Sequence, residues 1–422
     1  MRLLHTSDWH LGQHFMGQSR QAEHSALVDW LLTQVEAHAV DAVVIAGDIF
    51  DTGAPPSYAR ELYNQLIARL HRAGVALLLL GGNHDSVSVL GESQDLLAYL
   101  GTRVIAAVGE ASGHVVTLPL RGQSAEPGCI VCALPFIRPR DVVHSQAGQS
   151  AQDKQQALQT AIQATYQQVY DAAVARQTAL QQTLGRKLPI VATGHLTTVG
   201  ASSSESVREI YVGSLEAFPT TAFPAADYIA LGHIHQPQKV GGLEHIRYCG
   251  SPIALGFDEA RQTKQVLLVD LNEAGLQAVT PLPVPVFQPL ASVRSTLAEL
   301  PSALQALAAS ATPERPVWLE VTIEEDDYLT DLAPRVQALL EGLPMQLLRI
   351  KRQRGTAAAQ LTADASESLD ELSPQEVFAR RLAQETLEPA LQQALTARYR
   401  QVVDRVTSAA GDAAEDVPGG AA

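Results

Sequence analysis

The sequence predicts an α/β (α+β) fold in which two sheets pack together and helices cover the outside. Two observations carry this prediction: strands and helices alternate over the first hundred residues, and many short strands follow before the alternation restarts. Apolar runs at residues 2–8, 41–48 and 75–85 indicate strands, and residues 21–40 and 58–74 have helical spacing. This βαβαβ order favours parallel strands with covering helices.

Shorter strands are expected over residues 103–109, 114–120, 129–136, 188–195, 227–235, 245–252 and 264–271. One or two helices should occupy the Gln- and Ala-rich residues 145–185, and Gly241 and Gly242 should form a hairpin turn. Cys129 and Cys132 lie three apart in a strand and so point to opposite faces. That spacing favours two core side chains over a zinc or redox site, and an odd total of three cysteines argues against a disulfide framework.

Proline-rich residues 281–289 mark the clearest domain boundary. We expect a first domain over residues 1–280 and a small α/β capping domain over residues 281–355. Its helices are expected near residues 297–307 and 329–342, and its strands near 317–325 and 345–353. A polar linker over 356–371 and a helical segment over 372–407 should follow, with Ser373 as N-cap and Pro374 at the first helical position. The acidic, Ala-rich tail over 408–422 should be disordered.

The chain carries 45 acidic and 30 basic residues, a formal charge of −15. This balance is unfavourable for a protein that holds nucleic acid alone, because phosphate contacts need Lys and Arg. Nucleic acid binding would then depend on a local basic patch, on bound cations or on a basic partner. No apolar run approaches the roughly 18 residues of a membrane helix, and MRLLHTSDWHLG has no signal-peptide apolar region, so we expect a soluble cytoplasmic protein with no membrane partner.

Metal-capable side chains stand directly after five of the strand-like runs, where an open α/β sheet binds its ligands. A single D-x-H or G-x-H usually marks a turn, but five such clusters together favour one site at one sheet edge. Mixed oxygen and nitrogen ligands suit manganese, iron or zinc better than magnesium or calcium, and two ions about 3.5–4 Å apart form a clamp for attack at phosphorus. The seven expected metal ligands are Asp8, His10, Asp48, Asn83, His195, His233 and His235.

The leaving oxygen of a phosphodiester also needs a proton, and a histidine that is not a ligand could supply it. His84 stands beside Asn83, so it should lie near the metals without necessarily binding them. Asp51 follows Asp48 by three residues and is expected to orient His84 as a carboxylate–imidazole pair.

The ordered set D-x-H, GD-x-x-D, GNHD, GH and GHxH resembles the calcineurin-like metallophosphoesterase superfamily over about residues 1–280. The resemblance implies a β-sandwich flanked by helices, with His84 as transition-state stabiliser and proton donor. By motif position, one metal would be held by Asp8, His10, Asp48 and His235. The other would be held by Asp48, Asn83, His195 and His233.

The chain also resembles the SbcD family of bacterial nuclease subunits over nearly its full length. This resemblance rests on the longer sequence motifs TSDWHLG, GDIFDTGAPPSYAR, YCGSPIALGFDEA and LSPQEVFARRL. This implies a manganese-dependent DNA exonuclease and endonuclease that processes double-strand ends and hairpins in replication, recombination and repair. It also implies an SbcC-type coiled-coil ATPase as partner, and a homodimer within a heterotetramer.

Three segments outside the motifs have two interpretations each. The run LRIKRQR offers Arg349, Lys351, Arg352 and Arg354, which either form a solvated edge strand or contact DNA, as the capping domain does in the family. The helices of residues 372–407 either pack on their own chain or dock onto the coiled-coil base of the partner. The segment ESQDLLAYL forms either a homodimer contact, by resemblance, or a core helix.

Two other functions use the same motifs. A phosphatase or phosphodiesterase acting on small nucleotides would share every metal ligand, but would not need a capping domain, a basic run and partner helices. A non-catalytic scaffold would have no reason to keep His84 and all seven ligands.

Overall fold

The computed structural model describes residues 1–143, 150–202, 207, 217–308, 311–324, 331–352, 382, 395, 396, 398 and 399. One compact unit contains Met1–Thr322 and Asp331–Lys351, and a second contains Ile323–Thr330 and Arg352–Ala422. The predicted linker, the tail that was predicted to be disordered and most of the predicted partner-binding helices lie outside the described residues. The domain boundaries drawn from the sequence therefore stay predictions.

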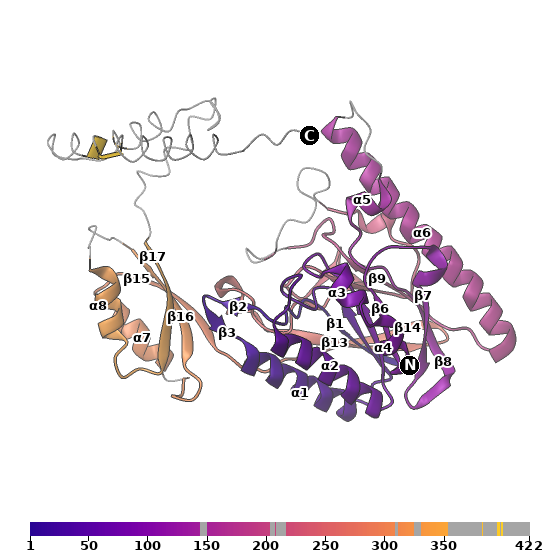
Figure 1. Cartoon of the computed structure of the whole chain (residues 1–422), viewed down its shortest axis with the longest axis horizontal. Helices are drawn as coiled ribbons and strands as arrows, with labels where there is room; N and C mark the ends of the chain where they lie inside the picture. Colours follow the sequence, from indigo (N-terminus) through magenta and orange to yellow (C-terminus); the bar gives the residue numbers. More distant parts are fainter. Residues whose placement is uncertain are drawn as a thin grey trace, which may run out of the picture. The chain divides into compact units, whose positions relative to one another are not determined.

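The first sheet of the larger unit has the order β14-β13-β1-β4-β5-β6. Its parallel strands are β1 (Arg2–Thr6), β4 (Ala42–Ala46), β5 (Ala76–Leu80) and β6 (Thr102–Ile105). The antiparallel strands β13 (Gln265–Asn272) and β14 (Gly275–Pro283) complete it on the β1 side. Helices α1 (Gln21–Ala37) and α2 (Ser57–Arg72) connect the first strands and run side by side (Figure 1), so the predicted βαβαβ unit is confirmed.

The second sheet has the order β11-β12-β10-β9-β8-β7. Its strands are β7 (Val115–Leu120), β8 (Gln123–Cys132), β9 (Ile190–His195), β10 (Tyr228–Gly232), β11 (Gln238–Val240) and β12 (Leu243–Tyr248). The predicted hairpin between β11 and β12 is confirmed, and Gly241 and Gly242 both have positive φ there.

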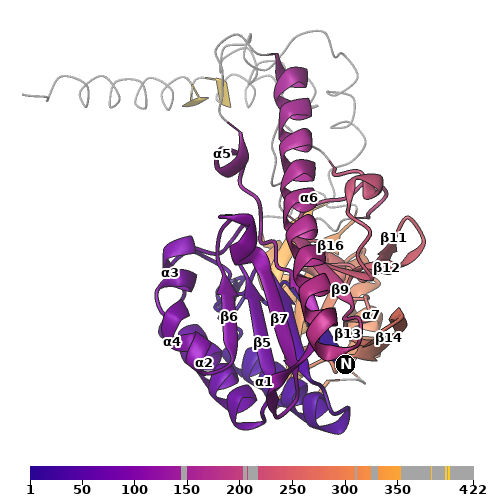
Figure 2. The same ribbon diagram turned by 90° about the vertical axis from the view of Figure 1, so that its right-hand side faces the viewer.

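One long helix covers the second sheet where the sequence allowed one or two. Helix α6 (Ala151–Leu184) begins with a capping box between Ser150 and Asp153 and ends at left-handed Gly185. In Figure 2 it stands on the side of β7 and β9, whereas α1 to α4 cover the opposite side of the molecule, next to β5 and β6. Of the described helices, none is both long and apolar enough to span a bilayer.

Three buried layers hold the larger unit together, and strand alternation creates them. Val43 and Ile45 of β4 pack with α1 and α2, while Val44 on the same strand packs between the two sheets. The third layer lies between the second sheet and α6. Each central strand therefore has one face in one buried layer and the other face in the next. Because both faces are buried, these strands have continuous apolar runs.

The cysteine and histidine positions follow the same alternation. Cys129 lies between the sheets and Cys132 lies under α6, both as free thiols, so the interpretation of this pair as core side chains is confirmed. His5 of β1 lies within hydrogen-bond distance of the Tyr228 hydroxyl on β10, at 2.9 Å from Nδ1. Burial lowers the pKa of His5 to about 3, so this ring is neutral in the folded protein.

The proline-rich boundary differs from its predicted form. Pro281 and Pro283 belong to β14, where they pair with β13, so the connecting segment begins only after Pro283. The strand tolerates prolines because it is at the edge of its sheet, where its outward N–H groups are not needed for pairing.

A three-stranded sheet follows, in the order β15-β16-β17. It consists of β15 (Leu290–Ser295), β16 (Val317–Ile323) and β17 (Met345–Arg352), with α7 (Leu300–Ala308) and α8 (Leu332–Leu339) as its helices. The sequence predicted both helices, β16 and β17, but not β15. Trp318 of β16 packs against Phe15 and Phe257 of the preceding part of the chain.

Short elements complete the described part of the chain. They are β2 (His14–Phe15), β3 (Gln18–Ser19), α3 (Val87–Gly91), α4 (Gln94–Tyr99), η1 (Ala111–His114), α5 (Pro139–Val142), η2 (Thr220–Ala222) and η3 (Phe257–Glu259).

Candidate metal centre

The predicted ligand motifs follow the ends of five strands, but these strands belong to two sheets. The motifs after β1, β4 and β5 come from the first sheet, and those after β9 and β10 come from the second. The expectation of a single sheet edge was therefore wrong in this respect. The two edges meet where His195 Nδ1 donates to the Ala46 carbonyl at 2.9 Å, because the sheets are packed face to face.

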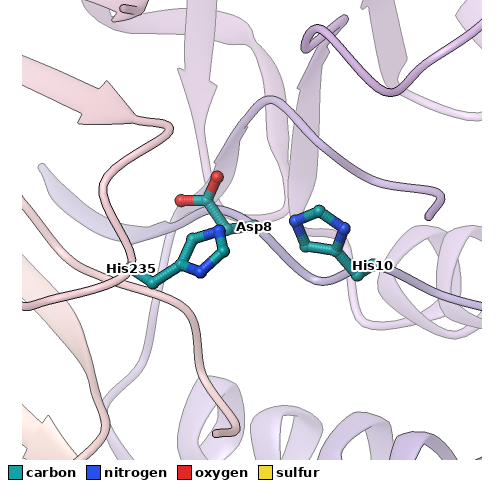
Figure 3. Close-up of side chains that lie close together, drawn as sticks. All are labelled: Asp8, His10 and His235. Carbon is teal, nitrogen blue, oxygen red and sulfur yellow. The ribbon is translucent and has the colours of Figure 1, made fainter. Parts of the chain in front are cut away.

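The structure brings the seven predicted ligands together. One atom each of Asp8, His10 and His235 lies within 4.8 Å of the others, and Figure 3 shows Asp8 and His10 on one segment and His235 reaching them from another. A second group of the same tightness contains Asp48, His195 and His233. The seventh, Asn83, lies with its Oδ1 at 2.9 Å from His195 Nε2.

Asp48 joins the two groups. Its Oδ2 lies 3.2 Å from His195 Nε2 in one group and 3.6 Å from His10 Nε2 in the other. The carboxylate is buried and its other oxygen accepts from the His84 backbone N–H at 2.9 Å. A carboxylate in this position has the geometry to bridge two cations.

Strained backbone positions the ligands. Asp8, His10, Asp48 and His233 have φ angles of 55°, 48°, 47° and 94°, a region that costs non-glycine residues about 1–3 kcal/mol each. Hydrogen bonds between the loops hold this conformation. The Asp8 N–H donates to the Gly47 carbonyl at 3.0 Å, and the His233 N–H donates to Asp8 Oδ1 at 2.9 Å.

The glycines that precede the proposed ligands Asp48 and Asn83 cannot carry a side chain, because other proposed ligands approach them closely. A Cβ on Gly82 would lie 2.8 Å from Asp48 Cγ and closer still to Asp48 Oδ1. A Cβ on Gly47, which has a φ of 94°, would lie 2.7 Å from His195 Cγ. These contacts explain in physical terms why glycine recurs in the motifs.

The cluster is electrostatically suited to a cation. Burial alone would raise the pKa of Asp48, but His195, followed by His10 and His84, holds that pKa well below its usual range. Burial opposes protonation of His195, yet the charge and hydrogen bond of Asp48 raise the pKa of His195 to about 9. The buried groups therefore draw positive charge into the cluster, which either protons or metal ions can supply.

Two buried imidazole nitrogens support metal ions as the source of that charge. Within the described residues, His10 Nε2 and His233 Nε2 have no hydrogen-bond partner. His5 Nε2 and both ring nitrogens of His24 also lack one, but of these histidines only His10 and His233 stand in groups that could hold a metal ion. Such atoms are rare in folded proteins because an unsatisfied buried polar group costs about 1–3 kcal/mol. The donor set of carboxylates, imidazoles and an amide oxygen fits manganese, iron or zinc.

His84 and Asp51 lie beside the cluster, but their contact differs from the predicted carboxylate–imidazole pair. His84 Nδ1 donates to the backbone carbonyl of Asp51 at 2.8 Å, whereas the Asp51 carboxylate lies 3.1 Å from His10 Nδ1. The His10 and His84 rings pack edge to face with centroids 4.7 Å apart, so Asp51 reaches both rings, one with its carboxylate and the other with its carbonyl. Its carboxylate thus orients a predicted ligand, and its carbonyl orients the predicted acid.

Two supporting carboxylates had no role predicted from the sequence. Asp85 accepts the backbone N–H groups of Ile49, Phe50 and Gly82 at 3.1, 2.9 and 2.8 Å, and so ties the Asp48 loop to the Asn83 loop. Burial and then Asp48 raise the pKa of Asp85 to about 6. Glu259 lies 2.8 Å from His235 Nδ1. Asp85 could have been suspected from its place in GNHD, whereas Glu259 is far from His235 in the sequence.

The basic run is partly engaged within its own sheet. Glu320 of β16 is buried, and its Oε2 lies 3.4 Å from Arg349 Nε and 3.1 Å from Lys351 Nζ. Both cations line a cavity of about 500 Å³ that also includes His14 from the β2–β3 hairpin. Exposed Arg352 ends β17, and Arg354 lies outside the described residues.

Comparisons with known proteins agree with this geometry. The family model of the calcineurin-like phosphoesterases matches residues 1–237, and that of the type 5 capsule protein repressor C-terminal domain matches residues 286–386. The SbcD subunit of the nuclease SbcCD from Escherichia coli (strain K12) is 50% identical over 396 residues, which cover 94% of this chain and 96% of the relative. The chain belongs to the SbcD family of calcineurin-like phosphoesterases. This SbcD-family chain is accordingly a nuclease subunit and a hydrolase of phosphodiester bonds.

More distant members of the SbcD family match as well. The corresponding SbcCD nuclease subunit of Rhodobacter capsulatus is 33% identical over 393 residues, 90% of this chain and 94% of the relative. That of Bacillus subtilis is 32% identical over 273 residues, 64% of this chain and 66% of the relative. The resemblance to the SbcD family and the expected two-sheet fold flanked by helices are confirmed.

Proposed function

We propose that this SbcD-family chain is a two-metal DNA nuclease subunit with exonuclease activity on duplex ends and endonuclease activity on hairpins and single strands. One observation carries the proposal: Asp48 lies between the two histidine groups at 3.2 and 3.6 Å. A shared carboxylate is what a pair of divalent cations needs, because it binds both and offsets their repulsion. We infer that the cations are Mn²⁺, because the resemblance to the SbcD family implies manganese and the mixed nitrogen and oxygen donors fit it.

The ligands divide into two sets that share Asp48. Asp8, His10 and His235 would hold the first cation, and their grouping within 4.8 Å supports this set. Asn83, His195 and His233 would hold the second. When bound, the cations would supply hydroxide near neutral pH and neutralise charge on the phosphoryl oxygens.

The proposed role of His84 follows from its hydrogen bond. The Asp51 carbonyl can only accept, so His84 Nδ1 must carry a proton. His84 Nε2 is then the nitrogen that exchanges protons, and it would deliver one to the leaving oxygen of the DNA strand. Edge-to-face packing on the His10 ring, with centroids 4.7 Å apart, keeps the His84 ring beside the ligands.

DNA contact is proposed for Arg349, Lys351, Arg352 and Arg354. The pairing of Arg349 and Lys351 with Glu320 supports this role, because one buried carboxylate holds two half-exposed cations in fixed positions at the cavity. Asp258 lines the same cavity, so Arg349 and Lys351 only balance its two carboxylates. Phosphate binding against a net charge of −15 would therefore also need Arg352, Arg354, the bound cations or a basic partner.

The partner interactions are proposals as well. The relatives are subunits of the nuclease SbcCD, and an SbcC-type coiled-coil ATPase is the partner that we infer for residues 372–407. We also propose a homodimer, and with the ATPase a heterotetramer, working in the cytoplasm in DNA replication, recombination and end repair. Helix α4 supports the dimer, because Leu96 and Tyr99 are 65% and 86% exposed.

A cleavage assay on linear duplex DNA, hairpin DNA and a generic aryl phosphodiester tests the proposal. We expect Mn²⁺ to support cleavage of both DNA substrates better than Mg²⁺, with and without the ATPase partner. The variant His84→Ala should lose cleavage while it still binds two Mn²⁺ ions. Turnover of the aryl ester without any cleavage of DNA would favour a small-substrate phosphodiesterase, and undiminished DNA cleavage by His84→Ala would remove the proposed acid.

A further inference from the structure

A buried ion pair stands directly behind one of the proposed metal ligands. Glu259, at the end of η3, is fully buried, and its Oε1 lies 2.8 Å from His235 Nδ1. Its Oε2 accepts from Lys264 Nζ at 2.6 Å and from the Leu255 N–H at 3.0 Å. Every one of these contacts fixes the carboxylate in one orientation, with one oxygen assigned to the imidazole.

Lys264 is arranged to hold that carboxylate. It is 6% exposed, and its Nζ also lies 3.0 Å from the His235 carbonyl oxygen, 2.9 Å from Ser251 Oγ and 3.0 Å from Gln262 Oε1, so with Glu259 four acceptors surround its three N–H groups. The same cation thus contacts the backbone of His235 and the carboxylate that contacts its ring. Lys264 therefore helps to position both the main chain and the side chain of His235.

The stability of the folded protein does not explain why the ion pair of Glu259 and Lys264 is buried. Removing two charges from water costs several kcal/mol each, and apolar residues of similar volume often stabilise a protein as well or better. A buried Lys–Glu pair in contact with a proposed metal ligand is instead the arrangement expected where an imidazole must bind metal. There the carboxylate accepts the second ring N–H, fixes the tautomer and increases the basicity of the ring.

The two proposed metal sites differ in this respect. In the first, His235 and His10 each have a carboxylate at Nδ1, from Glu259 at 2.8 Å and from Asp51 at 3.1 Å. In the second, His195 Nδ1 donates to the neutral carbonyl of Ala46. Both histidines of the first set thus have a carboxylate at Nδ1, whereas His195 of the second set has a neutral carbonyl there.

We propose that Glu259, held by Lys264, is a positioning residue that makes the site of Asp8, His10 and His235 the tighter of the two cation sites. Glu259 directs the His235 Nε2 lone pair to the cation without binding it. The inference rests on the proposed two-metal function and adds to it an order of affinity: the first site fills before the second, which is loaded at higher metal concentration.

Manganese titration followed by electron paramagnetic resonance of the free ion tests this inference on the full chain. The parent protein should show a tight and a weaker site. The variant Glu259→Gln should weaken the tight site by about 10- to 100-fold, the usual effect of losing such a partner, and leave the weaker site within about twofold. Glu23→Gln is the matched control, because Glu23 is also buried and pairs with Arg20 at 2.6 Å; its manganese affinities should equal those of the parent.

The double variant Glu259→Gln/Lys264→Met separates positioning from stability. It removes both charges, so its thermal midpoint in EDTA should equal or exceed that of the parent, while the tight site is weakened as in the single variant. Parental affinities in both variants would overturn the inference, as would equal weakening of both sites or a double variant that fails to fold. A parent that binds two Mn²⁺ but cleaves no DNA would instead contradict the proposed function alone.

Discussion

Replacing Gly82 by alanine should disable the metal centre, although the change adds only one methyl group. The new Cβ would lie 2.8 Å from Asp48 Cγ, and it would overlap more closely with Asp48 Oδ1 and the Asp48 backbone nitrogen. Carbon atoms in contact prefer roughly 3.5–4.0 Å, so the two loops must separate by about 1 Å. Movement of this size is resisted on the other side, because the Gly82 N–H is bonded to Asp85.

The displaced residue is the one that we assign to both cations, so both sites should weaken together. A misplacement of about 1 Å at a catalytic centre can lower the rate about 10²-fold, and we expect a loss of at least that size in kcat/KM for DNA cleavage. Saturating Mn²⁺ should restore only part of it, because the geometry of the bridge stays wrong.

Gly91→Ala is the matched control, because nothing lies within 4 Å of a Cβ at that position. Both variants should be assayed for DNA cleavage at several Mn²⁺ concentrations, with circular dichroism to verify folding. Gly91→Ala should retain parental activity. Folded Gly82→Ala protein with kcat/KM within threefold of Gly91→Ala would refute the requirement that Asp48 occupy its observed position.

Three further outcomes follow from other parts of the structure. Arg349→Ala and Lys351→Ala should each weaken DNA binding about equally for all sequences and lower the salt-dependence slope by about 1; an unchanged slope would mean that these side chains form only a solvated strand. Tyr99→Ser should shift the oligomer toward monomer in sedimentation experiments on the full chain, and an unchanged distribution would contradict a dimer through α4. His5→Gln should flatten the acid dependence of stability, measured by urea unfolding in EDTA. The His5 pKa is about 3 in the fold and about 6.5 when unfolded, so protons favour unfolding and stability is lost as the pH falls below 6.5. From pH 7.5 to 5.5 the parent should lose about 1.4 kcal/mol more than His5→Gln, which can still bond Tyr228, and equal losses would contradict a neutral His5.

Much of the metal centre was accessible from the sequence because its residues sit where strands end. Asp8, Asp48 and Asn83 each follow an apolar strand, and parallel strands deliver such positions to a common edge. What the alternation of strands could not reveal is that His195 and His233 arrive from a second sheet. Sheet membership depends on pairing between distant strands, which local patterns do not encode.

The side-chain contacts behind the ligands were harder to predict. Asp51 was expected to use its carboxylate on His84, but spacing along a loop does not say whether a carboxylate or a carbonyl will face a given ring. Glu259 lies 24 residues after His235, beyond the β11–β12 hairpin, and an acidic residue there has no distinguishing spacing.

The fold was predicted best where apolar periodicity was strong and worst where it was weak. Residues 317–323 have a dense apolar pattern and form β16, whereas residues 290–295 (LASVRS) have neither a continuous apolar run nor regular alternation and were not recognised as β15. Prolines at 281 and 283 suggested a linker, but an edge strand accommodates them.

Anomalous diffraction at the manganese edge, from crystals grown with Mn²⁺, is the most direct test of the claim that two cations share Asp48. We expect two peaks about 3.5–4 Å apart, with the Asp48 carboxylate between them, His10 and His235 beside one peak, and His195 and His233 beside the other. A single peak, or two peaks of which neither contacts Asp48, would contradict the two-metal centre.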